Sequence, residues 1–313
     1  MFIYEKAAFP SCHASTIVEV AGLHMRPIFL AAWFGGKAEG AKDVKIYWSS
    51  FDGKSWSAPE VAAEEPNQPC WNPVLFRSQA GTLSLWYKAG PSPQTWTGYV
   101  RHSKDNGKTW SPSEMIPAGL LGPVRAKPIQ LADGTILAGT SVESYKSWAS
   151  YVDRSSDDGK TWTRHGPIVI PNKPHSLIQP TLFETKDGQI VAMCRSSKTG
   201  RIARSESKDA GKTWSPARLI ELPNPSAGID AVRLTSGEIV LIYNHTPLFR
   251  FPLNLAISAD DGKTWKPLKT LEGAAGEYSY PAIVQGQDGM LHCTYTWNRS
   301  HIKYVVVDPK NPG

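Results

Sequence analysis

The amino-acid sequence predicts an all-β protein, a six-bladed β-propeller with four-stranded antiparallel blades. The first observation is a box of the pattern Ser-x-Asp-x-Gly-x-Thr-Trp, which occurs four times and is preceded by a shortened copy at Ser50–Trp56. The tryptophans that end the five copies are at positions 56, 110, 162, 214 and 265, so the period is 51 to 54 residues. The second observation is the length, because 313 residues hold six such periods. Repeated four-stranded units of this size are typical of propeller blades.

Each box predicts a tight turn between two strands. The Asp side chain can accept hydrogen bonds from the turn backbone, and the Gly allows a positive φ. The Thr and Trp then begin the next strand, with the indole over the turn, and the Lys is an exposed tip. The Gly-Lys-Thr sequence is not a phosphate-binding loop, because such a loop needs a second Gly five residues earlier. Those positions hold His102, Arg154, Glu206 and Ile257.

A second repeat between the boxes predicts pairs of strands joined by Asp/Gly hairpins. It is plainest in the segments 72–88, 179–195 and 280–296. Each unit therefore reads strand, hairpin, strand, loop, strand, box, strand. The last unit stops one strand short, after residues 302–308, and the opening residues 2–5 are expected to supply the missing outer strand and close the propeller. No linker or low-complexity tract interrupts the chain, so residues 1–313 are expected to form a single domain.

Composition excludes several classes of protein. The four cysteines occur in no CxxC pair, so packed thiols are expected rather than a disulfide scaffold or a structural zinc. There is no run of about 18 apolar residues for a membrane span, and the start of the chain lacks the features of a signal peptide, which leaves the localisation open. The net charge of +6 does not indicate nucleic-acid binding, because five lysines are box tips spread around the rim.

Neither a cofactor nor a metal ion is expected. The histidines show no metal-ligand spacing, and the boxes lack the alternating oxygen ligands of a calcium loop. A monomer is expected.

The alignment of the six units predicts where a binding site lies. In a propeller, the first strands and the loops that join them line the mouth of a central channel. The residues just before the first strands are all polar: His13, Asn72, Lys127, Gln179, Asp230 and Tyr280. Residues that face a wet channel are polar in any propeller, but a ring of six also predicts a pocket for a polar ligand. Further residues near the mouth are Arg125, Glu277 and Tyr278, and Trp96 could stack on a sugar ring.

Two arginines at this end of the predicted blades point to an anionic ligand. Arg195 ends the second strand of the fourth unit, and Arg250 lies in the loop before the third strand of the fifth. An arginine at the end of an apolar strand usually pairs with a carboxylate of its own protein or binds an anion. A surface charge is the alternative for Arg250.

The boxes on a six-bladed propeller resemble the Asp-box, or BNR repeat, of the sialidase (neuraminidase) superfamily, over essentially the whole chain. The resemblance implies a glycoside hydrolase, exo-acting on a terminal acidic sugar such as sialic acid or a related ulosonic or uronic acid. It implies that Arg195 and Arg250 are the second and third of three arginines that bind the substrate carboxylate. Tyr278 would be the nucleophile, and Glu39, with Asp43 as the alternative, the acid/base carboxyl group.

The sequence departs from that family at two places. Cys12-His13-Ala14 replaces the Arg-Ile-Pro signature, so the first arginine is missing, and Gln179 stands at the place of the Glu that partners the tyrosine. Gln179 cannot take the phenol proton, whereas His13 or Glu277 could.

These departures leave two alternatives to a hydrolase. One is a propeller-fold polysaccharide lyase, in which His13 abstracts the proton next to a uronate and Tyr278 protonates the leaving group. The other is a non-catalytic glycan-binding propeller. The sugar, its linkage and the stereochemical outcome stay open.

Overall fold

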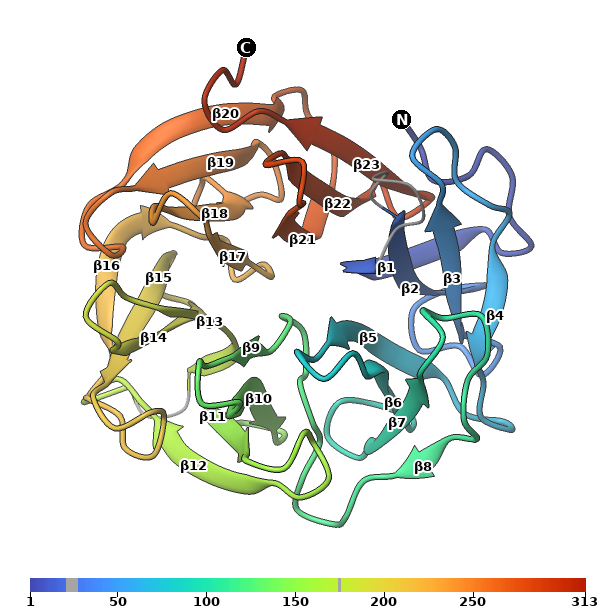
Figure 1. Ribbon diagram of the computed structural model, residues 1–313, viewed down its shortest axis with the longest axis horizontal. Helices are drawn as coiled ribbons and strands as arrows, with labels where there is room; N and C mark the ends of the chain where they lie inside the picture. Colours follow the sequence, from blue (N-terminus) through green and yellow to red (C-terminus); the bar gives the residue numbers. More distant parts are fainter. Residues whose placement is uncertain (21–27, 174–175) are drawn as a thin grey trace. The chain divides into compact units, whose positions relative to one another are not determined.

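The structure is a computed structural model and describes residues 1–20, 28–173 and 176–313. The regular secondary structure of these residues consists of β-strands alone. The strands form six antiparallel sheets, five of four strands and one of three. These sheets are the blades of a six-bladed β-propeller, which confirms the predicted fold class (Figure 1). In the described part of the chain, no helix has the length and hydrophobicity to cross a membrane.

The chain clusters into two compact units, of which the first comprises residues 1–121 and 280–312. It holds the sheets β1–β4, β5–β8 and β21–β23, each with its strands in sequence order. The bounds are β1 Ser11–Val20, β2 Ile28–Gly36, β3 Lys45–Phe51, β4 Glu60–Ala63, β5 Cys70–Arg77, β6 Leu83–Ala89, β7 Thr97–Ser103, β8 Glu114–Met115, β21 Tyr278–Gln285, β22 Leu291–Trp297 and β23 His301–Val307. The single-domain organisation stays a prediction.

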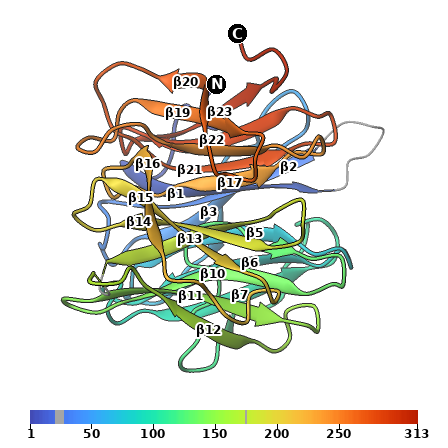
Figure 2. The same cartoon turned by 90° about the vertical axis from the view of Figure 1, so that its left-hand side faces the viewer.

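The second unit comprises residues 122–279 together with Gly313. Its sheets are β9–β12, β13–β16 and β17–β20, and Figure 2 shows β13, β14 and β15 side by side. The bounds are β9 Ile129–Gln130, β10 Ile136–Glu143, β11 Trp148–Ser155, β12 Thr163–Ile168, β13 Leu177–Glu184, β14 Ile190–Ser196, β15 Arg201–Ser207, β16 Arg218–Pro223, β17 Asp230–Arg233, β18 Ile239–Asn244, β19 Leu253–Ser258 and β20 Lys266–Glu272.

Apolar side chains of neighbouring sheets pack together inside each unit. In the first unit one cluster contains the fully buried Phe29, Trp33 and Ile302. In the second unit another contains Phe183 and Leu241, also buried. Each such side chain contributes about 1.5–3 kcal/mol by leaving water. The four cysteines are buried thiols in these sheets, which confirms the expected packing.

The four complete boxes form the same hydrogen-bonded turn. In the second sheet, Asp105 Oδ1 accepts from the backbone N of Thr109 at 2.9 Å, and Asp105 Oδ2 accepts from the Thr109 hydroxyl at 2.6 Å. Gly107 has a φ of +88°, and its carbonyl accepts the indole N–H of Trp110 at 3.1 Å. The boxes at Ser155, Ser207 and Ser258 repeat these bonds. The predicted turn chemistry is confirmed.

The first strands β1, β5, β13 and β21 each contain a non-glycine residue with a left-handed backbone, and the register of β1, β5 and β13 shifts at that residue. Asn72, Gln179 and Tyr280 have φ of +40°, +55° and +50°, and each precedes a proline. In β1 the residue with positive φ is Ala14, at +59°, and the register shift lies between His13 and Thr16. The sequence alignment of this blade is therefore one residue out, because Ala14, not His13, is the counterpart of Gln179.

The opening residues pair with β23 through an isolated bridge rather than a regular strand. Phe2 bridges Lys303, Ile3 N donates to the Ile302 carbonyl at 2.9 Å, and Tyr304 N donates to the Met1 carbonyl at 2.9 Å. Closure of the propeller by this segment stays a prediction.

Candidate functional site

In the five sheets that carry a box, the box and the predicted site residues lie at opposite ends. The first strand begins where the second ends, and the box follows the third strand at the other end. We call the end at which the first strand begins the site end.

Arg195 lies at the site end of the β13–β16 sheet and is nearly buried, with 7 % exposed. Its Nη1 donates to Gln179 Oε1 at 3.1 Å, because Gln179 is on the neighbouring strand. Its guanidinium lies over the indole of Trp148, 5.6 Å from the ring centroid. The planar cation is thus held by an amide on one side and an aromatic face on the other, and it could bind a carboxylate with two parallel hydrogen bonds.

A second cluster in this unit contains Arg250, Glu277 and Tyr278. Arg250 Nη1 donates to Glu277 Oε1 at 2.9 Å, and the Ser279 hydroxyl donates to the same oxygen at 3.2 Å. The Tyr278 backbone is fixed on both sides, because its N donates to the Arg250 carbonyl and its carbonyl accepts from Asn244 Nδ2, each at 2.9 Å. Tyr278 is 4 % exposed, so its side chain is largely buried.

Lys127 and Asp230 form an ion pair between the first and third sheets of the second unit. Lys127 Nζ is 2.9 Å from Asp230 Oδ2 and 2.8 Å from the Ala231 carbonyl. Asp230 Oδ1 accepts from the Thr181 hydroxyl at 3.0 Å, and only 1 % of the Asp230 side chain is exposed. Lys127 and Asp230, both predicted to bind ligand, are therefore paired with each other. Removal of one partner of a buried ion pair strongly destabilises the folded protein.

Glu143 is a site-end residue that the sequence analysis missed. It is the last residue of β10, its register partner is Trp148, and it is 9 % exposed. Burial raises the pKa of the Glu143 carboxyl above its usual value, and the nearby Arg195 cation offsets only part of that rise. The sequence did contain a signal for Glu143. It is a charged residue at the end of a second strand, which is also where Arg195 was predicted in the next unit. Arg125, also predicted, is buried at 2 % exposed.

In the first unit the structure brings His13 and Tyr280 together. Their ring centroids are 4.1 Å apart, and His13 Nδ1 is 2.9 Å from Thr296 Oγ1. His13 is buried, whereas Tyr280 is half-buried and has the left-handed backbone described above. Left-handed non-glycine residues store strain and are concentrated at functional sites. The tyrosine beside His13 in this unit is thus Tyr280, which the sequence analysis had placed among the ligand-binding residues.

An aromatic series continues from this pair. Phe34 lies 5.7 Å from His13 and 5.9 Å from Trp71, and Trp71 lies 6.3 Å from Trp96, measured between ring centroids. Trp96 is 8 % exposed and Asn72 is 6 % exposed, so a ligand could contact only a small part of either residue.

The two candidate acid/base carboxyl groups lie in the loop 37–44 of the first unit. Glu39 is paired with Arg299 at 2.5 Å, and 41 % of its side chain is exposed. Asp43 Oδ2 accepts from the Lys37 backbone N at 3.1 Å and so caps its own loop. Both Glu39 and Asp43 are more exposed to solvent than Glu143.

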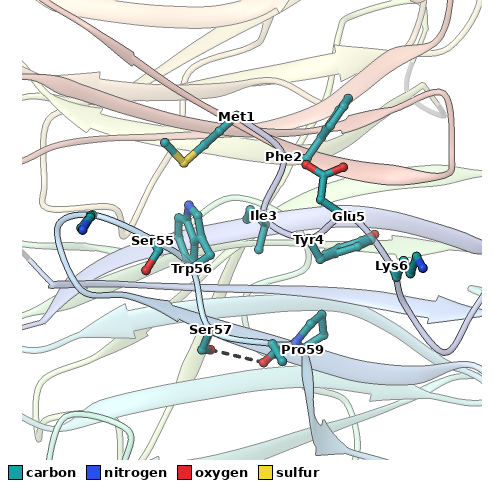
Figure 3. A pocket seen from close by; sticks show the side chains of 12 residues that line it. Met1, Phe2, Ile3, Tyr4, Glu5, Lys6, Ser55, Trp56, Ser57 and Pro59 are labelled. Atoms are coloured by element: carbon teal, nitrogen blue, oxygen red, sulfur yellow. Dashed lines mark hydrogen bonds between the residues drawn. The ribbon is translucent and has the colours of Figure 1, made fainter.

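A pocket of about 410 Å³ lies between the opening residues 1–6 and the segment 54–59 (Figure 3). It is at the box end of the first sheet, away from the predicted residues of that sheet. Within residues 1–20, 28–173 and 176–313 no group of three or more His, Cys, Asp or Glu side chains could hold a metal ion.

A model of the family described as BNR repeat-like domain matches residues 28–293. The chain belongs to this family. A sialidase of Bacteroides fragilis is 24 % identical to this BNR repeat-like protein in an alignment of 279 residues that covers 81 % of this chain and 49 % of the relative. A sialidase of Clostridium perfringens is 26 % identical over 161 residues, 45 % of this chain and 40 % of the relative. The chain spans about half the length of the curated relatives it matches.

Solved structures share the fold of this BNR repeat-like protein. The NanB sialidase of Streptococcus pneumoniae aligns with 100 % of this chain and 71 % of its own at a TM-score of 0.82 and 14 % identity. A protein of unknown function from Dyadobacter fermentans aligns over 98 % and 96 % at a TM-score of 0.79 and 18 % identity. At these identities the likeness shows the fold alone.

Proposed function

We propose that the protein is a glycoside hydrolase of the sialidase type, exo-acting on a terminal sugar that bears a carboxylate. The observation that carries the proposal is the setting of Arg195, bonded to the Gln179 amide and stacked on Trp148. A guanidinium fixed in this way is suited to a planar carboxylate. The sialidases of Bacteroides fragilis and Clostridium perfringens, which resemble this chain in sequence, support the same class of reaction.

In the proposed reaction, Arg195 and Arg250 bind the carboxylate of the sugar. The Tyr278 oxygen attacks or stabilises the anomeric carbon while the bond to the leaving oxygen breaks. A carboxylic acid gives its proton to that oxygen, and water then supplies a hydroxyl group to the sugar and a proton to the carboxylate. Tyrosine nucleophiles of sialidases are an exception to the usual pair of carboxylates. Glu277, which adjoins Tyr278 and is hydrogen-bonded to Arg250, is the proposed base for the phenol.

A second candidate, β-elimination next to a uronic acid, is favoured by the contact between His13 and Tyr280. When Nδ1–H of His13 donates to Thr296 Oγ1, Nε2 is the basic nitrogen. In this reaction His13 takes the proton next to the carboxylate, and the electron pair left behind forms a C=C bond. The C–O bond to the leaving group breaks, and the leaving oxygen takes a proton from the tyrosine. The structure favours Tyr280 over Tyr278 for this role, because Tyr280 is the tyrosine in ring contact with His13.

Mass spectrometry of the products from a panel of sialylated and uronate-terminated glycans, incubated in H₂¹⁸O, tests both candidates. Hydrolysis gives a free acidic sugar with one heavy oxygen across the cleaved bond. Elimination gives an unsaturated uronate with no heavy oxygen and contradicts the hydrolase. Intact glycans across the panel, together with binding of a panel member, identify a glycan-binding protein instead.

A further inference from the structure

Glu143 is a nearly buried carboxyl group with no role in the reaction proposed above. It ends β10 at the site end of its sheet and pairs in register with Trp148, the first residue of β11. Trp148 also forms a parallel bridge with Ser176, directly before β13. The site ends of the sheets β9–β12 and β13–β16 therefore meet at Trp148.

Arg195 reaches the same place from the other sheet. Its guanidinium lies 5.6 Å from the Trp148 ring centroid, and it interacts electrostatically with Glu143. Glu143 and Arg195 are 9 % and 7 % exposed, so neither is fully buried. The Arg195 guanidinium, where a ligand carboxylate would bind, is thus within electrostatic range of the Glu143 carboxyl group.

The other elements packed here add little charge near Glu143. β13 contributes the neutral amide of Gln179, and β11 contributes Trp148. The charged residues of β11 are Asp153 and Arg154, five and six residues farther along that strand, and Asp153 is paired with Arg164 on β12 at 3.0 Å. Lys146, in the loop 144–147, is exposed and lies over the ring of Tyr145.

We propose that Glu143 is a further ligand-binding residue, which carries a proton while Arg195 binds the carboxylate of an acidic sugar. Two ionised carboxylates beside one guanidinium repel each other, whereas a neutral carboxyl group donates its O–H to the bound carboxylate. Binding of the ligand therefore takes up one proton from solvent, and no covalent bond of the sugar changes. The burial that raises the pKa of Glu143 favours the same protonation state. The inference rests on the proposed function only in taking Arg195 as the residue that binds the carboxylate.

Binding of two probes, N-acetylneuraminic acid and glucuronic acid, between pH 4.5 and 8 tests the inference without turnover. For wild-type protein, we expect Kd to rise by about tenfold per pH unit once Glu143 ionises in the free protein. Calorimetry in buffers of different ionisation enthalpy should report uptake of one proton in that range. Glu143→Gln should bind the better probe with a Kd that does not change with pH and with no proton uptake.

Glu206→Gln is the matched control, because Glu206 also neighbours an arginine, Arg204, but on the third strand β15, next to the box. It should keep the wild-type pH dependence. A pH-independent Kd for wild-type protein, the same slope in Glu143→Gln, or binding of neither probe by wild-type protein overturns the inference. If the protein cleaves the glycan panel but the Kd of the probes does not change with pH, the role of Glu143 is contradicted and the proposed hydrolase is not. Proton-linked binding without cleavage contradicts the proposed hydrolase alone.

Discussion

The His13 ring lies 4.1 Å from the ring of Tyr280, at an angle of 49°. The two residues come from the first strands of two sheets in the same unit, and each is at or next to a residue with a positive φ. The two strands thus present a basic nitrogen and a phenol side by side. Whether this pair or Tyr278 performs the chemistry separates the two candidate reactions.

Substitution of the two tyrosines separates the hydrolase from the lyase. For the hydrolase, Tyr278→Phe should lower kcat by about 10²-fold or more, since it removes the nucleophile, while Tyr280→Phe keeps most of the activity. For the lyase, Tyr280→Phe and His13→Gln should cause the large losses. Initial rates on the substrate found by mass spectrometry, with folding checked by circular dichroism, give the answer. Equal and small effects of all three changes contradict both mechanisms.

Replacement of Arg195 should weaken the recognition of the carboxylate. Arg195→Lys loses the planar pair of donors, and we expect kcat/KM to fall by about 10²-fold, because charge-assisted hydrogen bonds contribute about 1.5–3 kcal/mol each. Arg164→Lys is the control, because Arg164 pairs with Asp153 on an outer strand. Wild-type kcat/KM for Arg195→Lys rules out Arg195 as a carboxylate-binding residue.

Glu143→Gln should change the pH dependence of stability. Folding raises the pKa of Glu143, so the folded state holds this proton more tightly than the unfolded chain. Wild-type protein therefore loses stability relative to Glu143→Gln as pH rises from about 4, the pKa region of an unfolded Glu, through the raised value. Urea unfolding of both proteins at pH 4 and pH 7.5 checks this. A difference that grows in favour of wild-type protein at the higher pH contradicts the prediction.

Asp230→Ala should be strongly destabilising, because it leaves Lys127 with a missing partner in a largely buried position. We expect a loss of about 3 kcal/mol in the free energy of unfolding, measured in urea. The exposed Glu60→Gln should stay within about 0.5 kcal/mol of wild type. A change as small as that of Glu60→Gln would mean that the Lys127 ion pair contributes little.

Removal of one box carboxylate should reduce stability more at neutral pH than at acidic pH. Hydrogen bonds from Thr213 and Ser207 lower the pKa of Asp209 to about 2, below the unfolded value of about 3.9. The stabilisation by Asp209 is thus present above pH 4 and is lost as pH falls toward 2. Asp209→Ala should lower Tm by a few degrees at pH 7 and by less at pH 2.5. Lys212→Ala, at the exposed tip of the same box, should leave Tm unchanged at both pH values.

The blades were predictable because their signals are local. Each box contains its own turn chemistry, and the hairpins recur at one period, so spacing alone gives the strands. The pair Gln179 and Arg195 was also within reach, since a hairpin places them on neighbouring strands. The sequence could have placed Glu143 at a strand end but not beside Arg195, because their electrostatic interaction depends on how two sheets meet at Trp148. Ala14 was misaligned because, unlike Asn72, Gln179 and Tyr280, it is not followed by a proline.

The opposite placement of boxes and site residues, in the five sheets that carry a box, has a consequence for how such a protein can change. The box turns have no atoms in common with the residues proposed to bind ligand. Apart from the Lys127–Asp230 ion pair, substitutions at the site end can therefore alter specificity while the box turns stay intact. A library randomised only at site-end positions should accordingly yield mostly folded variants, which makes this scaffold suitable for directed evolution toward other sugars.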